Sequence, residues 1–215
     1  SCICNSLFNK GVNFMVLKLY SGTPGSGKSL DVARKIYHAL RYGRPVIANF
    51  DINTSLIPKC RGTFISIDSY DLNPNVLRNY ADVLFSKTKF KEDYILLVID
   101  EAQILFNSRA WNSKGRDDWI RFFSNHRKYG YEIVLIAQFD KMLDRQIRSL
   151  LEYEYIHRKV SNFGTKGKIM SLCAGGNLFV CVKFWYPIKE KTDSEFYKAK
   201  KKYYQIYDTY NRFDK

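Results

Sequence analysis

The sequence has no long apolar stretch. Its longest uninterrupted apolar run is the six residues 94–99, whereas a membrane-spanning helix needs about 20. We therefore expect no transmembrane helix in these 215 residues. Residues 1–14 also lack the charged start, the apolar stretch and the cleavage site of a secretory signal. We expect the natural chain to start at Met15 and residues 1–14 to be an expression or upstream remnant; the alternative is a loosely ordered N-terminal arm.

Cysteine and histidine are scarce, with five and three residues respectively. Cys2 and Cys4 are one residue apart, which is not a zinc-ligand spacing, and no histidine adjoins a cysteine pair. The sequence therefore supports neither a zinc site nor a disulfide scaffold. We expect Cys60, Cys173 and Cys181 to be buried free thiols in a reducing compartment.

Acidic residues are outnumbered. The 21 Asp and Glu against 35 Lys and Arg give a formal net charge of +14. More than half of the excess lies in residues 157–202, which contain 11 basic and three acidic side chains. Such an excess favours polyanionic partners, namely nucleic acid, anionic lipid or phosphates. A solvated basic face fits the same pattern, so composition alone leaves the partner open.

Apolar segments alternate with helical ones along the first part of the chain. We expect strands at 16–20, 45–50, 94–99 and 133–137, and helices at 29–42, 75–85 and 117–129. The strands are apolar on both faces, which is typical of a parallel sheet covered on two sides. The pattern changes after residue 152. There we expect strands at 153–160, 169–174 and 178–186, separated by glycine turns, and then a basic terminal helix at 194–207.

These elements predict an α/β fold in two parts. Residues 15–152 form the core, a parallel sheet with helices on both faces. Residues 153–215 form a small β-meander and the terminal helix, packed on that core.

A phosphate-binding loop is the strongest motif. Residues 22–29, Gly-Thr-Pro-Gly-Ser-Gly-Lys-Ser, match G-x-x-x-x-G-K-[ST] at every fixed position. Glycines let the backbone wrap round a triphosphate, and successive amide N–H groups at a helix start point at the anion. Lys28 can reach the β and γ phosphates, and Ser29 can ligate Mg²⁺. The predicted strand before the loop and helix after it argue against a chance glycine-rich turn. The predicted nucleotide-binding residues are Gly22, Thr23, Pro24, Gly25, Ser26, Gly27, Lys28, Ser29 and Leu30.

Two carboxylates, Asp100 and Glu101, follow the apolar strand at 94–99. We expect Asp100 to hold Mg²⁺ and Glu101 to polarise the attacking water as general base. Kinases of this fold often lack the adjacent glutamate, so the pair favours hydrolysis of the nucleotide. Gln138 ends the next strand, and we expect it to lie beside the γ phosphate; a solvated strand end is the alternative.

ATPases of this kind often complete the site with an arginine from a neighbouring subunit. Arg127 and Arg148, downstream of the acidic strand, are candidates for that role. Each also fits a surface or DNA-contact residue.

Taken in order, the motifs resemble the zonula occludens toxin (Zot) family, the assembly ATPases of filamentous phages. The resemblance covers residues 15–213. It rests on the phosphate loop close to Met15, Arg-Pro-Val-Ile-Ala-Asn at 44–49, Ile-Asp-Glu-Ala-Gln at 99–103 with Phe106 and Arg109, His-Arg-Lys-Tyr-Gly at 126–130, the segment 133–138 with Asp144, Ile147 and Arg148, and the tyrosine-rich end at 203–210.

The resemblance implies a RecA-like P-loop NTPase that uses ATP and Mg²⁺ and works as a homo-oligomer. It also implies a domain at the cytoplasmic face of the host inner membrane that drives virion assembly and export of single-stranded DNA. Phage coat or assembly proteins are then partners, and the membrane contact runs through a segment absent from this soluble fragment. A small-molecule kinase and a nucleotide-binding scaffold without turnover remain the alternative functions.

Overall fold

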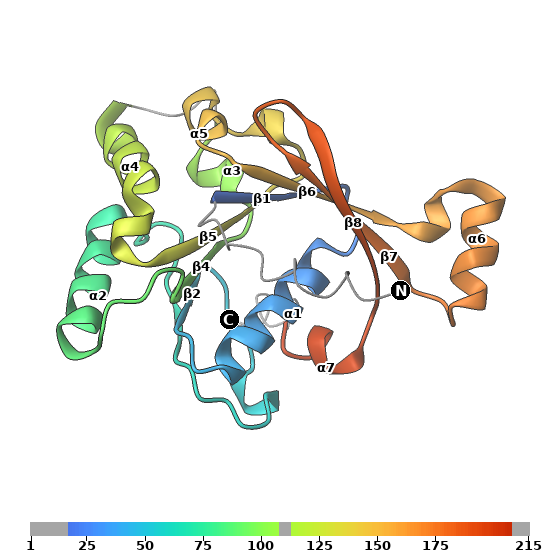
Figure 1. The fold of residues 1–215 in the computed structure, drawn as a ribbon, viewed down its shortest axis with the longest axis horizontal. Coiled ribbons are helices and arrows are strands. Elements are labelled where there is room, and N and C mark those ends of the chain that lie inside the picture. Colours follow the sequence, from blue (N-terminus) through green and yellow to red (C-terminus); the bar gives the residue numbers. More distant parts are fainter. Residues whose placement is uncertain (1–16, 108–112, 208–215) are drawn as a thin grey trace, which may run out of the picture.

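One mixed sheet organises the molecule, with helices on both of its faces (Figure 1). The computed structural model describes residues 17–107 and 113–207. The strands are β1 Leu17–Ser21, β2 Val46–Ala48, β3 Phe64–Ser66, β4 Ile95–Ile99, β5 Tyr131–Ile136, β6 Tyr153–Lys159, β7 Leu178–Trp185 and β8 Glu190–Lys198. The α-helices are α1 Lys28–Arg41, α2 Pro74–Lys87, α3 Ala102–Leu105, α4 Ser113–Asn125, α5 Arg145–Ser149, α6 Gly164–Cys173 and α7 Lys201–Tyr204. Short 3₁₀ turns lie at Thr54–Leu56, His126–Tyr129, Asp140–Met142 and Val160–Asn162.

The strand order in the sheet is β3-β2-β4-β5-β1-β6-β7-β8. The pairings from β3 to β6 are all parallel, and β7 and β8 then add antiparallel. This confirms the predicted parallel sheet. Because β5 lies between β1 and β4, the residues that follow these three strands meet at one edge of the sheet.

Alternating side chains along each strand build a core on both faces. On β5, Ile133 and Leu135 pack with α2, α4 and α5, whereas Val134 and Ile136 pack with α1 and α7. All five residues of β4 are fully buried. The double-sided burial explains why these strands are apolar throughout rather than alternating.

A buried ion cluster ties the second face together. The Glu132 carboxylate on β5 lies 2.6 Å from the Lys18 ammonium of β1 and 2.6 Å from the Lys35 ammonium of α1. Arg44, just before β2, contacts its other oxygen at 2.7 Å. Burial alone would raise the pKa of Glu132, but the three cations outweigh burial and hold that pKa well below its usual range. The cluster therefore links β1, α1, β2 and β5 through one carboxylate.

Two predicted elements after residue 152 are wrong. Residues 169–173 belong to helix α6 and Ala174 caps it, because Gly175 and Gly176, both at φ +81°, end a helix instead of turning a hairpin. A short apolar run does not by itself distinguish strand from helix.

The predicted terminal helix at 194–207 is also wrong, because its first five residues belong to a strand. Residues up to Lys198 form β8, and only Lys201–Tyr204 are α-helical. Pairing with β7 decides this conformation, and a charged sequence is common on an edge strand. The division into parts at residue 152 stays a prediction; β6, directly after it, pairs with β1 in the same sheet.

The cysteines only partly match expectation. Cys60, Cys173 and Cys181 are free thiols, but only Cys181 is buried, so the expected burial of the other two is wrong. Cys2 and Cys4 lie outside the described residues. Over the ranges 17–107 and 113–207, no helix has the length and apolar character needed to cross a membrane.

Candidate functional site

The phosphate loop (residues 22–29) joins β1 to α1, as predicted, and its backbone geometry requires glycine. Gly22 has φ +142°, and a Cβ there would lie 2.5 Å from the His157 carbonyl oxygen. Gly27 has φ +97°, and its Cβ would lie 2.6 Å from the Phe179 ring. The loop is therefore packed tightly against the strands beside it, and side chains at these two positions would displace it.

Lys28 folds back over this loop. Its ammonium donates to the carbonyl oxygens of Gly22 and, at 3.2 Å, Thr23. Burial lowers the pKa of Lys28, and the nearby Asp100 carboxylate opposes this shift. The hydroxyl of Ser26 is buried and has no hydrogen-bond partner among the described residues. The loop thus presents one ammonium and one unsatisfied hydroxyl donor, which suit the oxygens of a phosphate chain.

Asp100 lies directly after β4 and is held from several sides. Its backbone N–H donates to the Asn49 amide oxygen at 2.7 Å, and its carbonyl accepts from the Asn49 amide nitrogen at 2.9 Å. The Glu101 N–H donates to one carboxylate oxygen at 2.8 Å, and the Tyr207 hydroxyl donates to the other at 2.5 Å. This carboxylate is therefore oriented before any ligand binds.

The backbone of Glu101 adopts an unusual left-handed conformation, φ 48° and ψ 45°. This region is uncommon for residues other than glycine, and such conformations cluster at functional sites. Glu101 is exposed and caps the start of α3. Its carboxylate is thus adjacent in sequence to Asp100 and open to water.

The residues at this edge fit Mg²⁺. The ion prefers hard oxygen ligands and keeps several of its waters. Asp100 offers a fixed carboxylate, and Ser29 offers an exposed hydroxyl at the start of α1. Because β1 leads into the phosphate loop and β4 leads into Asp100 in one parallel sheet, this carboxylate and the loop lie at the same sheet edge.

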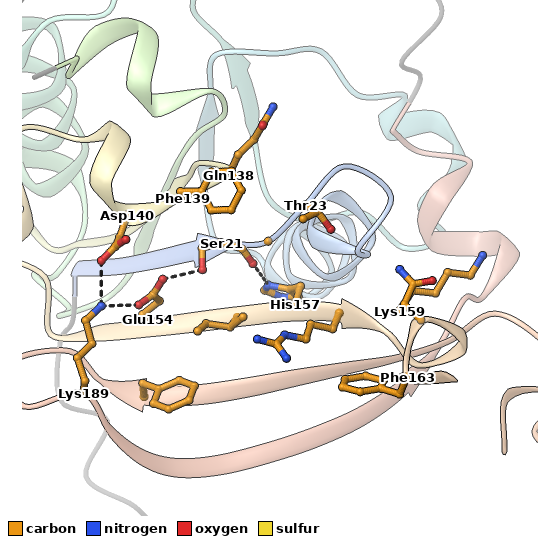
Figure 2. Close-up of a pocket in the computed structure, with 15 residues that line it drawn as sticks. Ser21, Thr23, Gln138, Phe139, Asp140, Glu154, His157, Lys159, Phe163 and Lys189 are labelled. Atoms are coloured by element: carbon orange, nitrogen blue, oxygen red, sulfur yellow. Dashed lines mark hydrogen bonds and ion pairs between the residues drawn. The ribbon is translucent and has the colours of Figure 1, made fainter. Parts of the chain in front are cut away.

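Gln138 also lies at this edge, two residues after the end of β5. Its carbonyl oxygen accepts a hydrogen bond from the Gly22 N–H at 3.1 Å, and its side chain is exposed (Figure 2). Gln138 therefore lies next to the phosphate loop. Its contact with the γ phosphate stays a prediction.

Arg127 and Arg148 lie elsewhere. Arg127 precedes β5 and Arg148 precedes β6, so both lie at the opposite edge of the parallel sheet. Arg127 is 3.5 Å from Glu152, the residue just before β6. Neither arginine belongs to the site of its own chain, and action on a neighbouring subunit stays a prediction.

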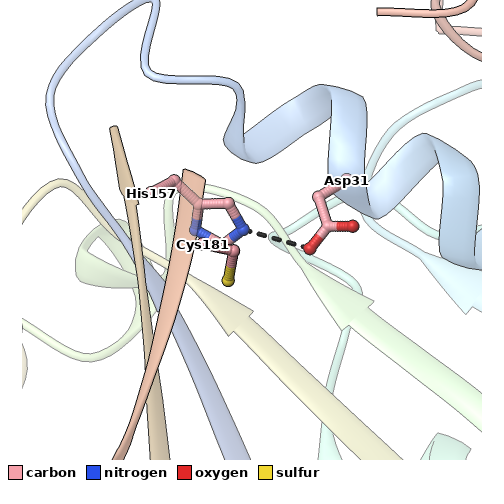
Figure 3. A group of neighbouring side chains, drawn as sticks. All are labelled: Asp31, His157 and Cys181. Atoms are coloured by element: carbon pink, nitrogen blue, oxygen red, sulfur yellow. Dashed lines mark hydrogen bonds and ion pairs between the residues drawn. The ribbon is translucent and has the colours of Figure 1, made fainter. Parts of the chain in front are cut away.

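Strands β6 to β8 support the phosphate loop from behind. The Tyr197 hydroxyl donates to the Gly27 carbonyl at 3.0 Å. His157 is fully buried, and one ring nitrogen lies 3.1 Å from an Asp31 carboxylate oxygen (Figure 3). The other lies 3.3 Å from the Ser21 carbonyl oxygen (Figure 2). The segment expected to be an appendage therefore fixes both ends of the loop.

Asp31, His157 and Cys181 place their potential ligand atoms within 4.8 Å of one another. Arg34 engages the Asp31 carboxylate at 2.8 Å, and His157 engages its other oxygen. Burial raises the pKa of the Cys181 thiol to about 12, which keeps it protonated. These contacts make the group part of the structural support of the loop.

Four supporting residues were missed by sequence analysis: Asn49, His157, Tyr197 and Tyr207. Asn49 and Tyr207 lie in segments that carry the family resemblance, which was the only signal for them. The contacts of His157 and Tyr197 join residues more than 125 positions apart, so no local pattern reveals them.

Comparison with known proteins gives consistent results. The profile of the family described as Zonular occludens toxin (Zot) matches residues 16–211. The gene 1 protein of Enterobacteria phage fd is 29% identical over 152 residues, covering 66% of this chain and 42% of that protein. The gene 1 protein of Escherichia phage If1 is 28% identical over 176 residues, covering 76% and 48%. The chain thus spans less than half the length of these curated relatives.

Solved structures share the fold. The N-terminal domain of zonular occludens toxin from Neisseria meningitidis aligns with a TM-score of 0.56 at 22% identity, covering 90% of this chain and 99% of that one. The genome packaging NTPase B204 from Sulfolobus turreted icosahedral virus 2, in complex with ATP-gammaS, aligns with a TM-score of 0.52 at 13% identity, covering 86% and 98%. The P-loop NTPase fold is confirmed, and the match over nearly the whole sequence shows that this chain belongs to the Zonular occludens toxin (Zot) family.

Proposed function

We propose that this chain is an ATP hydrolase that powers the assembly of a filamentous phage. The observation that carries the proposal is that Asp100, after β4, and Lys28 of the phosphate loop, after β1, lie at one edge of the parallel sheet. The adjacent Glu101 favours water as the acceptor over a small-molecule substrate. Structural likeness to an NTPase bound to ATP-gammaS supports the nucleotide class.

In the proposed mechanism, the loop amides and Lys28 hold the β and γ phosphates, and Ser29 and Asp100 hold Mg²⁺. Mg²⁺ held there would neutralise charge on the phosphate oxygens. Glu101 orients the attacking water and accepts its proton, while the bond between the γ phosphorus and the β–γ bridging oxygen breaks and ADP leaves. Gln138, next to the loop, contacts the γ phosphate and reports its loss. An arginine of a neighbouring subunit, Arg127 or Arg148, stabilises the charge that develops on the transferred group.

The family membership extends this proposal to the whole protein. The chain then acts as a homo-oligomer at the cytoplasmic face of the host inner membrane, joined to it by a segment outside this sequence. Its partners are phage coat or assembly proteins, and its work is export of single-stranded DNA. Similarity to the gene 1 proteins of filamentous phages supports this context.

Phosphate release from Mg–ATP without any added acceptor tests the proposed activity. We expect steady release by the wild type and a loss of at least ~100-fold in Lys28→Ala, because the ammonium that stabilises the transferred group is gone. A kinase would release no phosphate without its acceptor, and a scaffold would release none at all; either result would contradict the proposal.

Tyr207→Phe tests the support of Asp100. The change removes the hydroxyl donor but keeps the ring, which packs on Phe50 with centroids 4.8 Å apart. Partners that orient a metal ligand typically contribute about 10- to 100-fold in metal affinity or activity. We expect the Mg²⁺ concentration for half-maximal phosphate release to rise about tenfold.

The matched control is Tyr204→Phe, because Tyr204 is half exposed and also lies near the end of the described chain. It should leave the Mg²⁺ dependence unchanged. Binding of Mn²⁺, followed by electron paramagnetic resonance, gives a readout independent of turnover. Equal metal affinity in Tyr207→Phe and wild type would show that Tyr207 does not orient Asp100.

A further inference from the structure

Strands β6 to β8 have two faces with different surroundings. His157, Phe179 and Tyr197 point to the phosphate loop or pack against it. Their sequence neighbours Arg158, Val180 and Phe196 point to the opposite face, since successive side chains on a strand alternate. The same three strands thus contact the loop with one set of side chains and line a second surface with the other, and that surface reaches the loop at Gly22 and Thr23.

That second face is hollowed. A cavity of about 640 Å³ begins at Gly22 and Thr23 of the phosphate loop and runs along β6 (Figure 2). A second cavity of about 580 Å³ continues over β7 and β8 to helix α6. The two share the lining residues Ile156, Arg158, Phe163 and Phe184. They therefore form one continuous depression, here called the β6–β8 groove.

Aromatic rings line the groove and remain accessible. Phe163 is 48% exposed and Phe196 is 56% exposed, and the half-buried Phe184 on β7 lines both cavities. The aliphatic side chains of Val180 and Val182 complete the floor. Large rings left open in a concave surface indicate a site for a partner with flat apolar faces.

The rim of the groove is cationic. Arg158, Lys159, Lys166 and Lys191 line it, and no ion pair in the described part of the chain engages them. The carboxylates in the lining, Asp140 and Glu154, are neutralised by Lys189 at 3.0 Å and 2.7 Å (Figure 2). The groove therefore carries a net positive charge.

Open aromatic rings beside unpaired cations are the recognition chemistry of single-stranded nucleic acid, whose bases stack while its phosphates pair. A duplex hides its bases in its own stack and cannot use the rings. A lipid bilayer is broad and flat, so it does not fit a concave groove. From these features we infer that the β6–β8 groove binds single-stranded nucleic acid without sequence specificity.

The position of the groove has a consequence for the site. A strand of nucleic acid in contact with Phe196 and Arg158 lies one sheet thickness from Tyr197 and His157, which hold the phosphate loop. Binding in the groove then moves Tyr197 and His157 and, through them, the phosphate loop. This coupling rests on the proposed ATP hydrolysis, whereas binding itself does not.

Fluorescence anisotropy with a labelled 20-nucleotide oligo-dT, in the absence of ATP, tests the inference. Stacking is worth about 1–3 kcal/mol per base, and 1.4 kcal/mol is tenfold in affinity. We expect Phe163→Ala and Phe196→Ala each to weaken binding about tenfold or more. Lys166→Ala and Lys191→Ala should each lower the slope of log affinity against log salt concentration by about one, because each removes one phosphate contact.

Tyr70→Ala is the matched control, because Tyr70 is 96% exposed and lies far from the groove, after β3. It should bind as the wild type does. Because binding is measured without ATP, failure of this inference can be distinguished from failure of the proposed hydrolysis. Circular dichroism checks that each variant is folded. If either phenylalanine variant is unfolded, Lys191→Glu replaces it as the test variant and should weaken binding.

Three results would overturn the inference. One is equal affinity for oligo-dT and a hairpin duplex of the same length. Another is wild-type affinity in Phe163→Ala, Phe196→Ala and Lys191→Glu. The third is binding to vesicles with 30% phosphatidylserine but not to oligo-dT, which would make the surface a lipid contact instead.

Discussion

Replacing Glu101 by glutamine should lower the rate of ATP hydrolysis at least ~100-fold, because glutamine cannot accept the proton of the attacking water. Nucleotide binding should stay close to that of the wild type, since Glu101 is exposed and its backbone N–H still donates to Asp100. Single-turnover phosphate release measures the chemical step, and fluorescent nucleotide binding measures affinity.

Glu92→Gln provides the control, because Glu92 is an exposed glutamate just before β4 and is outside the site. It should hydrolyse ATP at the wild-type rate. An unchanged rate in Glu101→Gln would instead support a protein in which another group activates the water, or one that binds nucleotide without turnover.

Glu132→Gln should lower the free energy of unfolding by about 3–5 kcal/mol, the range for breaking a buried ion pair. The substitution leaves Lys18, Lys35 and Arg44 close together without their shared carboxylate. Urea unfolding followed by tryptophan fluorescence measures the change. Glu92→Gln is again the control and should leave the free energy of unfolding unchanged. An equal decrease in both variants would show that the ion cluster does not stabilise the fold.

The Glu132 carboxylate also makes the stability of the fold depend on pH in the acid range. The pKa of Glu132 is depressed in the folded state, so its contribution is present above the unfolded pKa, about 4.3. It is lost as the pH falls below that value towards the folded pKa, because the unfolded state binds the proton first. Between pH 7 and pH 3 the wild type should therefore lose more stability than Glu132→Gln. A parallel decline in both proteins would contradict this.

The phosphate loop and the acidic pair were predictable because their chemistry is local. Gly22 to Ser29 form a contiguous motif, and Asp100 needs only a parallel sheet to reach the same edge. The supporting contacts were not predictable. The Tyr207–Asp100 and Tyr197–Gly27 bonds join residues 107 and 170 positions apart and exist only once the last strands have packed.

The errors have the same physical origin. Residues 169–174 are apolar enough for a strand, but Gly175 and Gly176 close a helix there. Residues 190–198 are highly charged and become a strand because they pair with β7. In both places tertiary contacts or a backbone angle outweigh the local pattern. The part of the chain predicted least well is also the part that supports the phosphate loop and forms the β6–β8 groove.

Isothermal titration calorimetry of ATP binding, with and without Mg²⁺, tests whether the phosphate loop and Asp100 form one nucleotide site. We expect a single site whose affinity rises when Mg²⁺ is present and is lost in Lys28→Ala. We also expect Asp100→Asn to bind ATP without the Mg²⁺ effect. No heat with Mg–ATP, or equal binding by wild type and Lys28→Ala, would show that these residues form no such site.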